Sequence, residues 1–345
     1  MTSLPAPATA VEVIALIFSR QHLDKSKCQA LGEEVTNALW AELGSAGTST
    51  FVLQVLNPGR VIQVSVGGQD GCQVMARCTQ ASQADALTEI EAKHNVEVVI
   101  QPAELYHHHL QPGLAVFDMD STLIQQEVID ELARAVGLYD RVAAITEAAM
   151  RGEAPYIDFE ASLRARVALL KGVPTSIWDK LKTETIKFTP GAADLVKCLN
   201  ATGWKTAVLS GGFTPLANWV KETLGLDYAF ANHLVANNEE GILTGELVPG
   251  KPIIHGEKKR ELLVQLASDN AIPIARTIAV GDGSNDLPMM HTAGLGIAFN
   301  AKPKVQRAAP TRLNSSSLLD VMYILGYSKE QIDELLSKSR REKAV

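Results

Sequence analysis

The first hundred residues alternate between short continuous apolar runs and stretches in which apolar residues recur at spacings of three and four. The continuous runs predict strands, and the wider spacing predicts helices. In chain order these are a strand at 11–18, a helix at 25–43, strands at 49–56 and 60–66, a helix at 83–94 and a strand at 96–100. This β-α-β-β-α-β order is typical of ferredoxin-like α+β domains.

After residue 113 the apolar runs become fully hydrophobic, and each one ends abruptly in small, hydroxyl or acidic residues. The runs at 114–117, 206–209 and 277–280 are typical of buried parallel strands. Helical patterns separate them, which predicts a doubly wound α/β sheet. The stretch at 126–187 is long and helical, with no strand of its own.

Polar residues follow each of these strands at its carboxyl end, where open α/β sheets bind ligands. They are Asp118 and Asp120 after the first strand, Ser210 and Gly211 after the second, and Asp282 and Asp286 after the third. One acidic pair alone could be a helix cap or a surface turn. Two pairs after matching strand ends favour a single site, in which carboxylates act as nucleophile, proton carrier and ligands of a hard cation.

Two further features indicate that this site binds phosphate. Ser210, Gly211 and Gly212 combine a hydroxyl group with backbone that can approach a phosphate near a helix start, although many loops share this composition. Lys259 lies near the start of a predicted helix, where the helix dipole disfavours a cation. A nearby anion explains that lysine better than solvent exposure does.

Taken in order, these motifs resemble those of the haloacid dehalogenase superfamily of phosphotransferases, over roughly residues 112–310. The matching elements are Asp118-x-Asp120-x-Thr122, a serine after a strand, a lysine, and Gly281-Asp282-x-x-x-Asp286. The resemblance implies a doubly wound core, a helical cap at about 126–187 and a Mg²⁺ cofactor.

The resemblance also implies roles for the acidic residues. Asp118 is expected to attack phosphorus and form an aspartyl-phosphate. Asp120 is expected to protonate the leaving group and then to accept a proton from water. Mg²⁺ is expected to bind Asp118, the backbone carbonyl of Asp120 and Asp282, with Asp286 supporting the surrounding water from one layer out.

Four other residues are expected, by the same resemblance, to contact the substrate's phosphate. Ser210, the N–H group of Gly211 and Lys259 are expected to bind the phosphoryl oxygens. Asn285 is expected to contact either the phosphate or the rest of the substrate.

The sequence around the motifs is closer still to members of the superfamily that hydrolyse O-phospho-L-serine, the last step of serine biosynthesis. That substrate implies a contact from Glu127 to its α-ammonium group and one from Arg166 to its α-carboxylate. Without the resemblance, Glu127 would read as a partner of the helix dipole and Arg166 as a solvated side chain. Residues 154–157 lengthen the segment before Phe159 relative to the family pattern.

Two alternative functions stay open. One is a phosphatase or phosphotransferase acting on another small phosphomonoester, which only Glu127 and Arg166 argue against. The other is an amino-acid-sensing regulatory protein with an idle phosphatase core. The intact Asp118, Asp120 and Lys259 argue against that alternative.

The patterns predict an N-terminal domain at 10–101, a linker at 102–113, a core at 114–325 and a C-terminal helix and tail at 326–345. The N-terminal domain resembles ACT-type modules, which often pair, so a homodimer is an expectation. It carries no fingerprint for an amino-acid ligand. The adjacent residues His107, His108 and His109 cannot all point the same way, so we expect no metal there.

Composition narrows the list of partners. The chain has 345 residues and a net charge of −7, which gives no sign of nucleic-acid or membrane-surface binding. Its longest apolar stretch near the start, 13–18, is far too short to span a bilayer. Four cysteines without a Cys-x-x-Cys pair predict free thiols in a reducing compartment. We therefore expect a cytoplasmic protein that acts on a small molecule.

Overall fold

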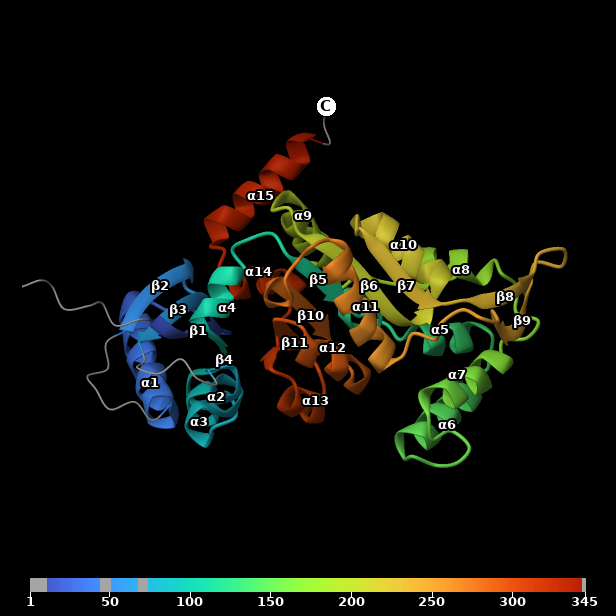
Figure 1. Cartoon of the computed structure of the whole chain (residues 1–345), viewed down its shortest axis with the longest axis horizontal. Coiled ribbons are helices and arrows are strands. Elements are labelled where there is room, and N and C mark those ends of the chain that lie inside the picture. The colour runs from blue at the N-terminus through green and yellow to red at the C-terminus, as the bar shows by residue number, and fades with distance from the viewer. Residues whose placement is uncertain (1–10, 44–50, 68–73, 343–345) are drawn as a thin grey trace, which may run out of the picture.

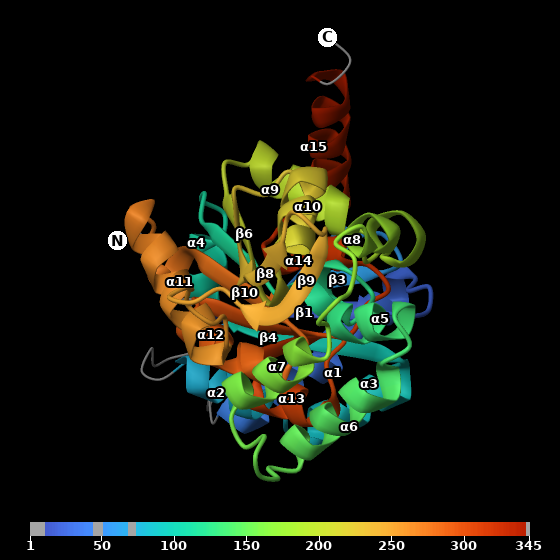
Figure 2. The same cartoon turned by 90° about the vertical axis from the view of Figure 1, so that its right-hand side faces the viewer.

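The computed structural model describes residues 11–43, 51–67 and 74–342. Three parts follow one another across the molecule in Figure 1. An N-terminal module with its own antiparallel sheet lies on the left, a parallel-sheet core lies in the centre, and a cap lies on the right. The C-terminal helix α15, Lys329–Glu342, extends away from the core (Figure 2).

The N-terminal module contains a four-stranded antiparallel sheet in the order β2-β3-β1-β4. Its strands are β1 Val11–Ser19, β2 Phe51–Asn57, β3 Val61–Gly67 and β4 Val96–Pro102. Its helices are α1 Lys25–Leu43, α2 Val74–Ala81 and α3 Asp85–His94. The β-α-β-β-α-β order is as the pattern predicted, with α2 as an additional helix. The predicted start of the second strand, and Cys72, lie outside the described residues.

Strand β1 of this sheet is buried on both faces, because alternate residues of a strand point to opposite sides. In β1, Ala15 and Ile17 join the hydrophobic cluster that includes α1. Leu16 and Phe18 join the large cluster of the core instead. The N-terminal module therefore shares a hydrophobic interface with the rest of the molecule.

The segment predicted to be a linker is folded. Its first residue, Pro102, ends β4, and helix α4, Ala103–His108, follows with Leu105 and Tyr106 buried. His109 is completely buried, whereas His107 is exposed, so these neighbouring rings lie in different environments. The segment packs between the two sheets instead of joining them loosely.

The core is a six-stranded parallel sheet in the order β12-β11-β10-β5-β6-β7. Its strands are β5 Leu114–Phe117, β6 Lys205–Phe213, β7 Tyr228–Asn232, β10 Thr277–Gly281, β11 Leu295–Phe299 and β12 Thr311–Leu313. The chain runs outward from β5 to β7 and then returns to β10 on the other side of β5. Such a reversal of strand order opens a crevice at the carboxyl ends of the strands.

Helices cover both faces of the parallel sheet. Leu114 and Val116 of β5 pack in a cluster with α11, whereas Ala115 and Phe117 pack in the opposite cluster with α9. The core helices are α9 Ala192–Ala201, α10 Thr214–Leu224, α11 Gly256–Asp269, α12 Leu287–Thr292, α13 Pro303–Ala308 and α14 Val321–Ile324. The doubly wound α/β fold predicted from the sequence is confirmed.

The cap has a helical part and a small sheet. Its helices are α5 Val128–Ala135, α6 Tyr139–Met150, α7 Phe159–Ala168 and α8 Ile177–Lys180. The hairpin β8 Leu234–Asn237 and β9 Ile242–Leu247 comes from a later segment. The Gly172 N–H donates to the Leu243 carbonyl at 2.8 Å. The hairpin therefore extends the cap, which the sequence predicted to be helical only. No helix within the described ranges is long and apolar enough to cross a membrane.

Candidate active site

Three loops meet at the carboxyl edge of the parallel sheet because its central strands end level with one another. Phe117 of β5 pairs with Val208 of β6 on one side and with Val280 of β10 on the other. The Asp118 N–H extends this pairing by donating to the Val280 carbonyl at 2.9 Å. The residues that follow the three strands are therefore brought together, as the sequence predicted.

A tight turn directs both aspartates of the first loop into the site. Asp118 is buried, and its Oδ1 accepts a 2.8 Å hydrogen bond from the Met119 N–H. Ser121 has a φ of 55°, so the chain reverses within two residues. Asp120 Oδ2 then accepts a 3.1 Å hydrogen bond from the Val128 N–H at the start of α5. Its other oxygen, Oδ1, is buried and has no hydrogen-bond partner within the described part of the chain.

The environment of Asp120 favours its protonated form. Burial, and then the negative charges of Glu127 and Asp118, raise the pKa of Asp120 well above its usual value. A protonated carboxyl group is a donor as well as an acceptor. The unpartnered Oδ1 can therefore hold a proton in the cavity that Asp118 also lines.

Lys259 lies completely buried behind Asp118. Its Nζ is 2.6 Å from Asp118 Oδ1 and 2.7 Å from Asp286 Oδ1. Burial by itself lowers the pKa of Lys259, but the two carboxylates outweigh it and raise the pKa above its usual value. The ammonium group therefore stays charged and fixes the orientation of both carboxylates.

Gly281, at the end of β10, makes room for this arrangement. A Cβ atom on Gly281 would lie 2.4 Å from Asp286 Oδ2. The same carboxylate accepts a 3.0 Å hydrogen bond from the Gly283 N–H, so it has little freedom to shift. The glycine of the Gly281-Asp282 pair is thus needed for Asp286 to reach Lys259.

The carboxylates of Asp118, Asp282 and Asp286 can bring one oxygen each to within 4.8 Å of one another. Burial, with the charges of Asp118 and Asp286, raises the pKa of Asp282 to about 8. Burial and the charge of Asp118 likewise raise the pKa of Asp286 to about 7. Buried oxygen ligands with excess negative charge fit a hard divalent cation such as Mg²⁺. Asp286 uses both of its oxygens, Oδ1 with Lys259 and Oδ2 with Gly283, whereas Asp118 receives both of its hydrogen bonds on Oδ1. Asp118 and Asp282 are therefore the more available ligands.

A cavity of about 820 Å³ extends from the aspartates to the cap. Seven of the predicted site residues line this cavity. They are Glu127, Arg166, Gly211 and Asn285, together with Asp118, Asp120 and Asp282. The remaining three, Ser210, Lys259 and Asp286, are completely buried and lie behind the cavity wall.

Glu127 and Arg166 bring opposite charges to the cap side of this cavity. Glu127 precedes α5 and accepts a 2.7 Å hydrogen bond from the Ser121 hydroxyl group. Arg166 lies in the last turn of α7, where its Nε donates to the Ser162 carbonyl at 3.2 Å. It forms no ion pair with any residue that the structure describes. The guanidinium group is thus available to an anionic ligand.

The second loop contributes backbone to the site. The Gly212 N–H donates to Ser210 Oγ at 2.8 Å, and the Gly211 carbonyl accepts from Asn232 Nδ2 at 2.8 Å. These bonds fix the two peptide groups beside the cavity. A Cβ on Gly211 would lie 3.3 Å from the Phe159 ring of the cap.

Sequence reasoning missed several residues of the cavity wall, among them Lys302 and Lys304 after β11, and Ile157 in the lengthened segment before α7. Ile157 is 70% exposed, which is unusual for a large aliphatic side chain. The sequence could have indicated the two lysines, because they follow another parallel strand and therefore lie at the same edge of the sheet as the other site residues.

Comparison with known proteins agrees with this geometry. Residues 115–291 match the model of the haloacid dehalogenase-like hydrolase family. Phosphoserine phosphatase of Saccharomyces cerevisiae is 39% identical over 322 residues, which cover 93% of this chain and 97% of that protein. A crystal structure of a probable phosphoserine phosphatase from Vibrio cholerae, in unliganded form, has a TM-score of 0.67 at 29% identity, covering 96% of this chain and 90% of that one.

A substrate-bound phosphoserine phosphatase structure is 40% identical with a TM-score of 0.56, and covers 62% of this chain and 98% of its own. That structure matches only part of this chain, whereas the yeast relative matches nearly all of it. The chain therefore belongs to the haloacid dehalogenase-like hydrolases and, within them, to the phosphoserine phosphatase family.

Proposed function

We propose that this enzyme hydrolyses O-phospho-L-serine to L-serine and phosphate, with Asp118 as the nucleophile and Mg²⁺ as the cofactor. The observation that carries the proposal is the one cavity in which Asp118 and Asp120 share a wall with Glu127 and Arg166. The first pair suits phosphoryl transfer, and the second suits a zwitterionic amino acid. The phosphoserine phosphatases among its relatives support the same substrate.

In the first step an Asp118 carboxylate oxygen bonds to phosphorus, and the bond between phosphorus and the serine oxygen breaks. Asp120 gives its proton to that departing oxygen, which would otherwise leave as a strongly basic alkoxide. Proton transfer of this kind contributes ~10²–10⁴-fold to the rate. The raised pKa of Asp120 keeps the proton available for this step.

In the second step a water molecule attacks phosphorus and transfers a proton to Asp120, and the bond between phosphorus and Asp118 breaks. Phosphate leaves, and both aspartates return to their starting states. When bound, Mg²⁺ supplies positive charge that offsets repulsion between the carboxylate and the phosphoryl oxygens. Asp118, the backbone carbonyl of Asp120 and Asp282 would hold it, and Asp286 would orient the surrounding water.

Lys259 and the second loop are proposed to stabilise the phosphoryl group. Lys259 sits 2.6 Å from the attacking carboxylate, where its charge also offsets that of an incoming phosphate. The Ser210 hydroxyl and the Gly211 N–H can donate hydrogen bonds to phosphoryl oxygens. Asn285, on the opposite loop, can donate to the phosphate or to the substrate beside it.

Phosphate release from O-phospho-L-serine and from a panel of other phosphomonoesters tests the proposal, with and without Mg²⁺. We expect release that requires Mg²⁺, prefers O-phospho-L-serine and is lost in Asp118→Asn. Arg166→Gln should raise KM, whereas Arg164→Gln should not, because Arg164 is paired with Glu160 outside the cavity. Mg²⁺-dependent release from other esters but not from this one would reject the substrate and the roles of Glu127 and Arg166.

We further infer that the product serves serine biosynthesis in the cytoplasm, and that the N-terminal module is ACT-like. A homodimer, an amino-acid ligand for that module and the division of the chain at 101 and 113 stay predictions. Size measurement by light scattering and titration with L-serine test the first two.

A further inference from the structure

The loop that joins β11 to α13 forms part of the wall of the active-site cavity. We call residues 300–304, which include the first two residues of α13, the rim loop. Lys302 and Lys304 on this loop line the cavity, and both side chains are exposed. Neither lysine forms an ion pair with a described residue, whereas Lys93, Lys197 and Lys205 each pair with a carboxylate. Their charges are therefore available to a ligand.

Carboxyl groups outnumber cationic side chains on the cavity wall, so each lysine there matters for binding an anion. Its wall contains six carboxyl groups, those of Asp118, Asp120, Glu127, Asp130, Asp158 and Asp282. The only cationic side chains on the described wall are Arg166, Lys302 and Lys304. Burial raises the pKa of Glu127, and the positive charge of Lys302 acts in the opposite direction on the same group. Lys302 thus acts electrostatically inside the cavity, where an anionic substrate must bind.

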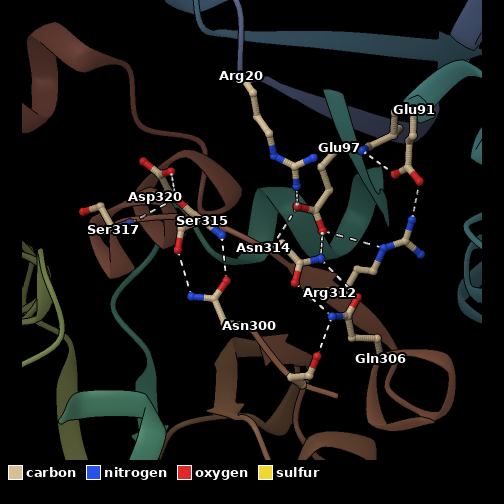
Figure 3. A network of polar contacts seen from close by, with 12 residues as sticks. Arg20, Glu91, Glu97, Asn300, Gln306, Arg312, Asn314, Ser315, Ser317 and Asp320 are labelled. Atoms are coloured by element: carbon tan, nitrogen blue, oxygen red, sulfur yellow. Dashed lines mark hydrogen bonds and ion pairs between the residues drawn. The ribbon is translucent and has the colours of Figure 1, made fainter. Parts of the chain in front are cut away.

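Two chains of polar contacts connect the rim loop to the N-terminal module. Figure 3 shows Asp320, Ser315 and Asn300 of the first, and Glu97, Asn314 and Gln306 of the second. The first connection begins at Arg60, which follows β2 and forms a bidentate ion pair with Asp320. Asp320 also accepts a hydrogen bond from the Ser315 hydroxyl. Ser315 exchanges two backbone bonds with the Asn300 side chain, at 2.8 and 3.0 Å. Asn300 has a φ of 46°, a turn conformation that asparagine tolerates.

The second connection begins at Glu97 of β4, which is 3% exposed. Glu97 accepts hydrogen bonds from the Asn314 N–H at 2.8 Å and from Asn314 Nδ2 at 2.9 Å. Asn314 Oδ1 in turn accepts from Gln306 Nε2 at 2.9 Å. Gln306 Nε2 also donates to the Ala301 carbonyl at 2.6 Å, one residue before Lys302. The first connection therefore ends on the Asn300 side chain, and the second ends on the Ala301 carbonyl next to Lys302.

From this geometry we propose that Lys302 is a further substrate-orienting residue, and that Arg60 and Glu97 of the N-terminal module are positioning residues that act through it. The proposal rests on the proposed function, because it assigns Lys302 to the anionic substrate of that reaction. The N-terminal module would thus influence the affinity of the active-site cavity for its substrate. It would do so through two short chains of hydrogen bonds that end beside Lys302.

Steady-state kinetics of Lys302→Gln test whether Lys302 orients the substrate. We expect KM for O-phospho-L-serine to rise about fivefold, equivalent to about 1 kcal/mol, while kcat stays within about twofold because the reacting atoms are untouched. The dependence of kcat/KM on ionic strength should become weaker, since a steering charge is lost. Lys338→Gln makes the same charge change on α15, where Lys338 pairs with Glu334, and should alter neither quantity.

A double-mutant cycle tests whether Arg60 and Glu97 act through Lys302. Glu97→Gln and Arg60→Gln should each raise KM in the wild-type background and have no further effect in the Lys302→Gln background. A loss through general destabilisation would instead add in both backgrounds. Gln101→Met is the matched control, because Gln101 bonds the Ile324 carbonyl across the same interface without touching the rim loop. It should leave KM unchanged.

The outcomes separate the two proposals. A wild-type enzyme that does not release phosphate from O-phospho-L-serine overturns the proposed function itself. A wild-type enzyme that does, with an unchanged KM and salt dependence in Lys302→Gln, overturns the role of Lys302. Additive effects in the cycle overturn the positioning role of the N-terminal module.

Discussion

At the scale of single residues, the site is defined by two aspartates that lie in different surroundings. Lys259 Nζ contacts Asp118 Oδ1 directly at 2.6 Å. Asp120, two residues later, forms no ion pair with any residue that the structure describes, and burial raises its pKa. Two similar side chains can therefore serve as nucleophile and as proton carrier, because only their environments differ.

Substitution of Asp120 by asparagine tests this division of roles. Asp120→Asn keeps the shape of the side chain but cannot exchange the proton, so kcat should fall by ~10²–10⁴-fold. The melting temperature should not fall, because the charged form of Asp120 is disfavoured in the folded state. Asp333→Asn on exposed α15 provides a control and should retain full activity. An Asp120→Asn enzyme with near-normal kcat would show that another group carries the proton.

A second prediction at this scale concerns His109, whose two ring nitrogens are buried without a hydrogen-bond partner among the described residues. Burial lowers the pKa of His109 to about 4, so the ring is neutral in the folded state. As the pH falls below the usual histidine pKa near 6.5, His109 binds a proton in the unfolded chain but not in the folded chain. Stability should therefore be unaffected above that pH and should decline toward pH 4, by about 3 kcal/mol from this residue alone.

Urea denaturation across this pH range measures the effect. His109→Gln should flatten the decline in unfolding free energy between pH 6.5 and 4, the two ends of the window for this ring. His291→Gln changes an exposed histidine and should leave the decline as it is in the wild type. An equal decline in all three proteins would mean that His109 is accessible to protons in the folded state.

At the scale of elements, β1 shows how one strand can serve two hydrophobic clusters. Leu16 is completely buried against the core, and its neighbours Ala15 and Ile17 are completely buried against α1. A strand buried on both faces reads as a continuous apolar run, as β1 does. The interface between module and core is therefore built into the strand pattern.

Truncation of Leu16 should reveal this interface. Leu16→Ala should lower the free energy of unfolding by about 2–5 kcal/mol through the cavity that it leaves. Val55→Ala on β2 is a matched control, because Val55 is 44% exposed, and surface changes of this kind stay within about 0.5 kcal/mol. Unfolding followed by urea titration checks both values. A loss for Leu16→Ala as small as that of the control would place the interface outside the folded core.

The elements also show how far the sequence alone can lead. Asp118, Lys259 and Asp282 follow from local motifs, since each lies directly beside a strand end or helix start. The place of the hairpin β8–β9 in the cap depends on its contact with Gly172, which no local pattern encodes. The same holds for Lys302: its role depends on Glu97, which is distant in sequence and reaches it through Asn314 and Gln306.

At the scale of the whole molecule, the N-terminal module and the cap lie at opposite ends of the core, and the catalytic edge of the sheet opens toward the cap (Figure 1). The core collects carboxylates from strands that are far apart in the sequence. Asp118, Asp282 and Asp286 repel one another there, which is reflected in the raised pKa values of the last two. The folded state should therefore gain stability from a divalent cation.

A thermal-denaturation series checks this coupling. Mg²⁺ at a hundred times its dissociation constant should stabilise the protein by about 2.7 kcal/mol, and EDTA should reverse the shift. Asp282→Asn should raise the melting temperature of the metal-free protein at neutral pH, because Asp282, whose pKa is raised to about 8, must take up a proton on folding and asparagine need not. The same substitution should abolish the response to Mg²⁺. Glu239→Gln, in the cap hairpin turn away from the cavity, should respond to Mg²⁺ as the wild type does. A full response in Asp282→Asn would mean that the cation binds elsewhere.

The most direct single measurement is rapid acid quenching of the enzyme during turnover of O-phospho-L-serine with Mg²⁺, followed by mass spectrometry of its peptides. The structure predicts one phosphoryl group on Asp118 in the wild type and none in Asp118→Asn. Turnover without any covalent phosphoenzyme, or a phosphoryl group on another residue, would contradict the assignment of Asp118 as the nucleophile.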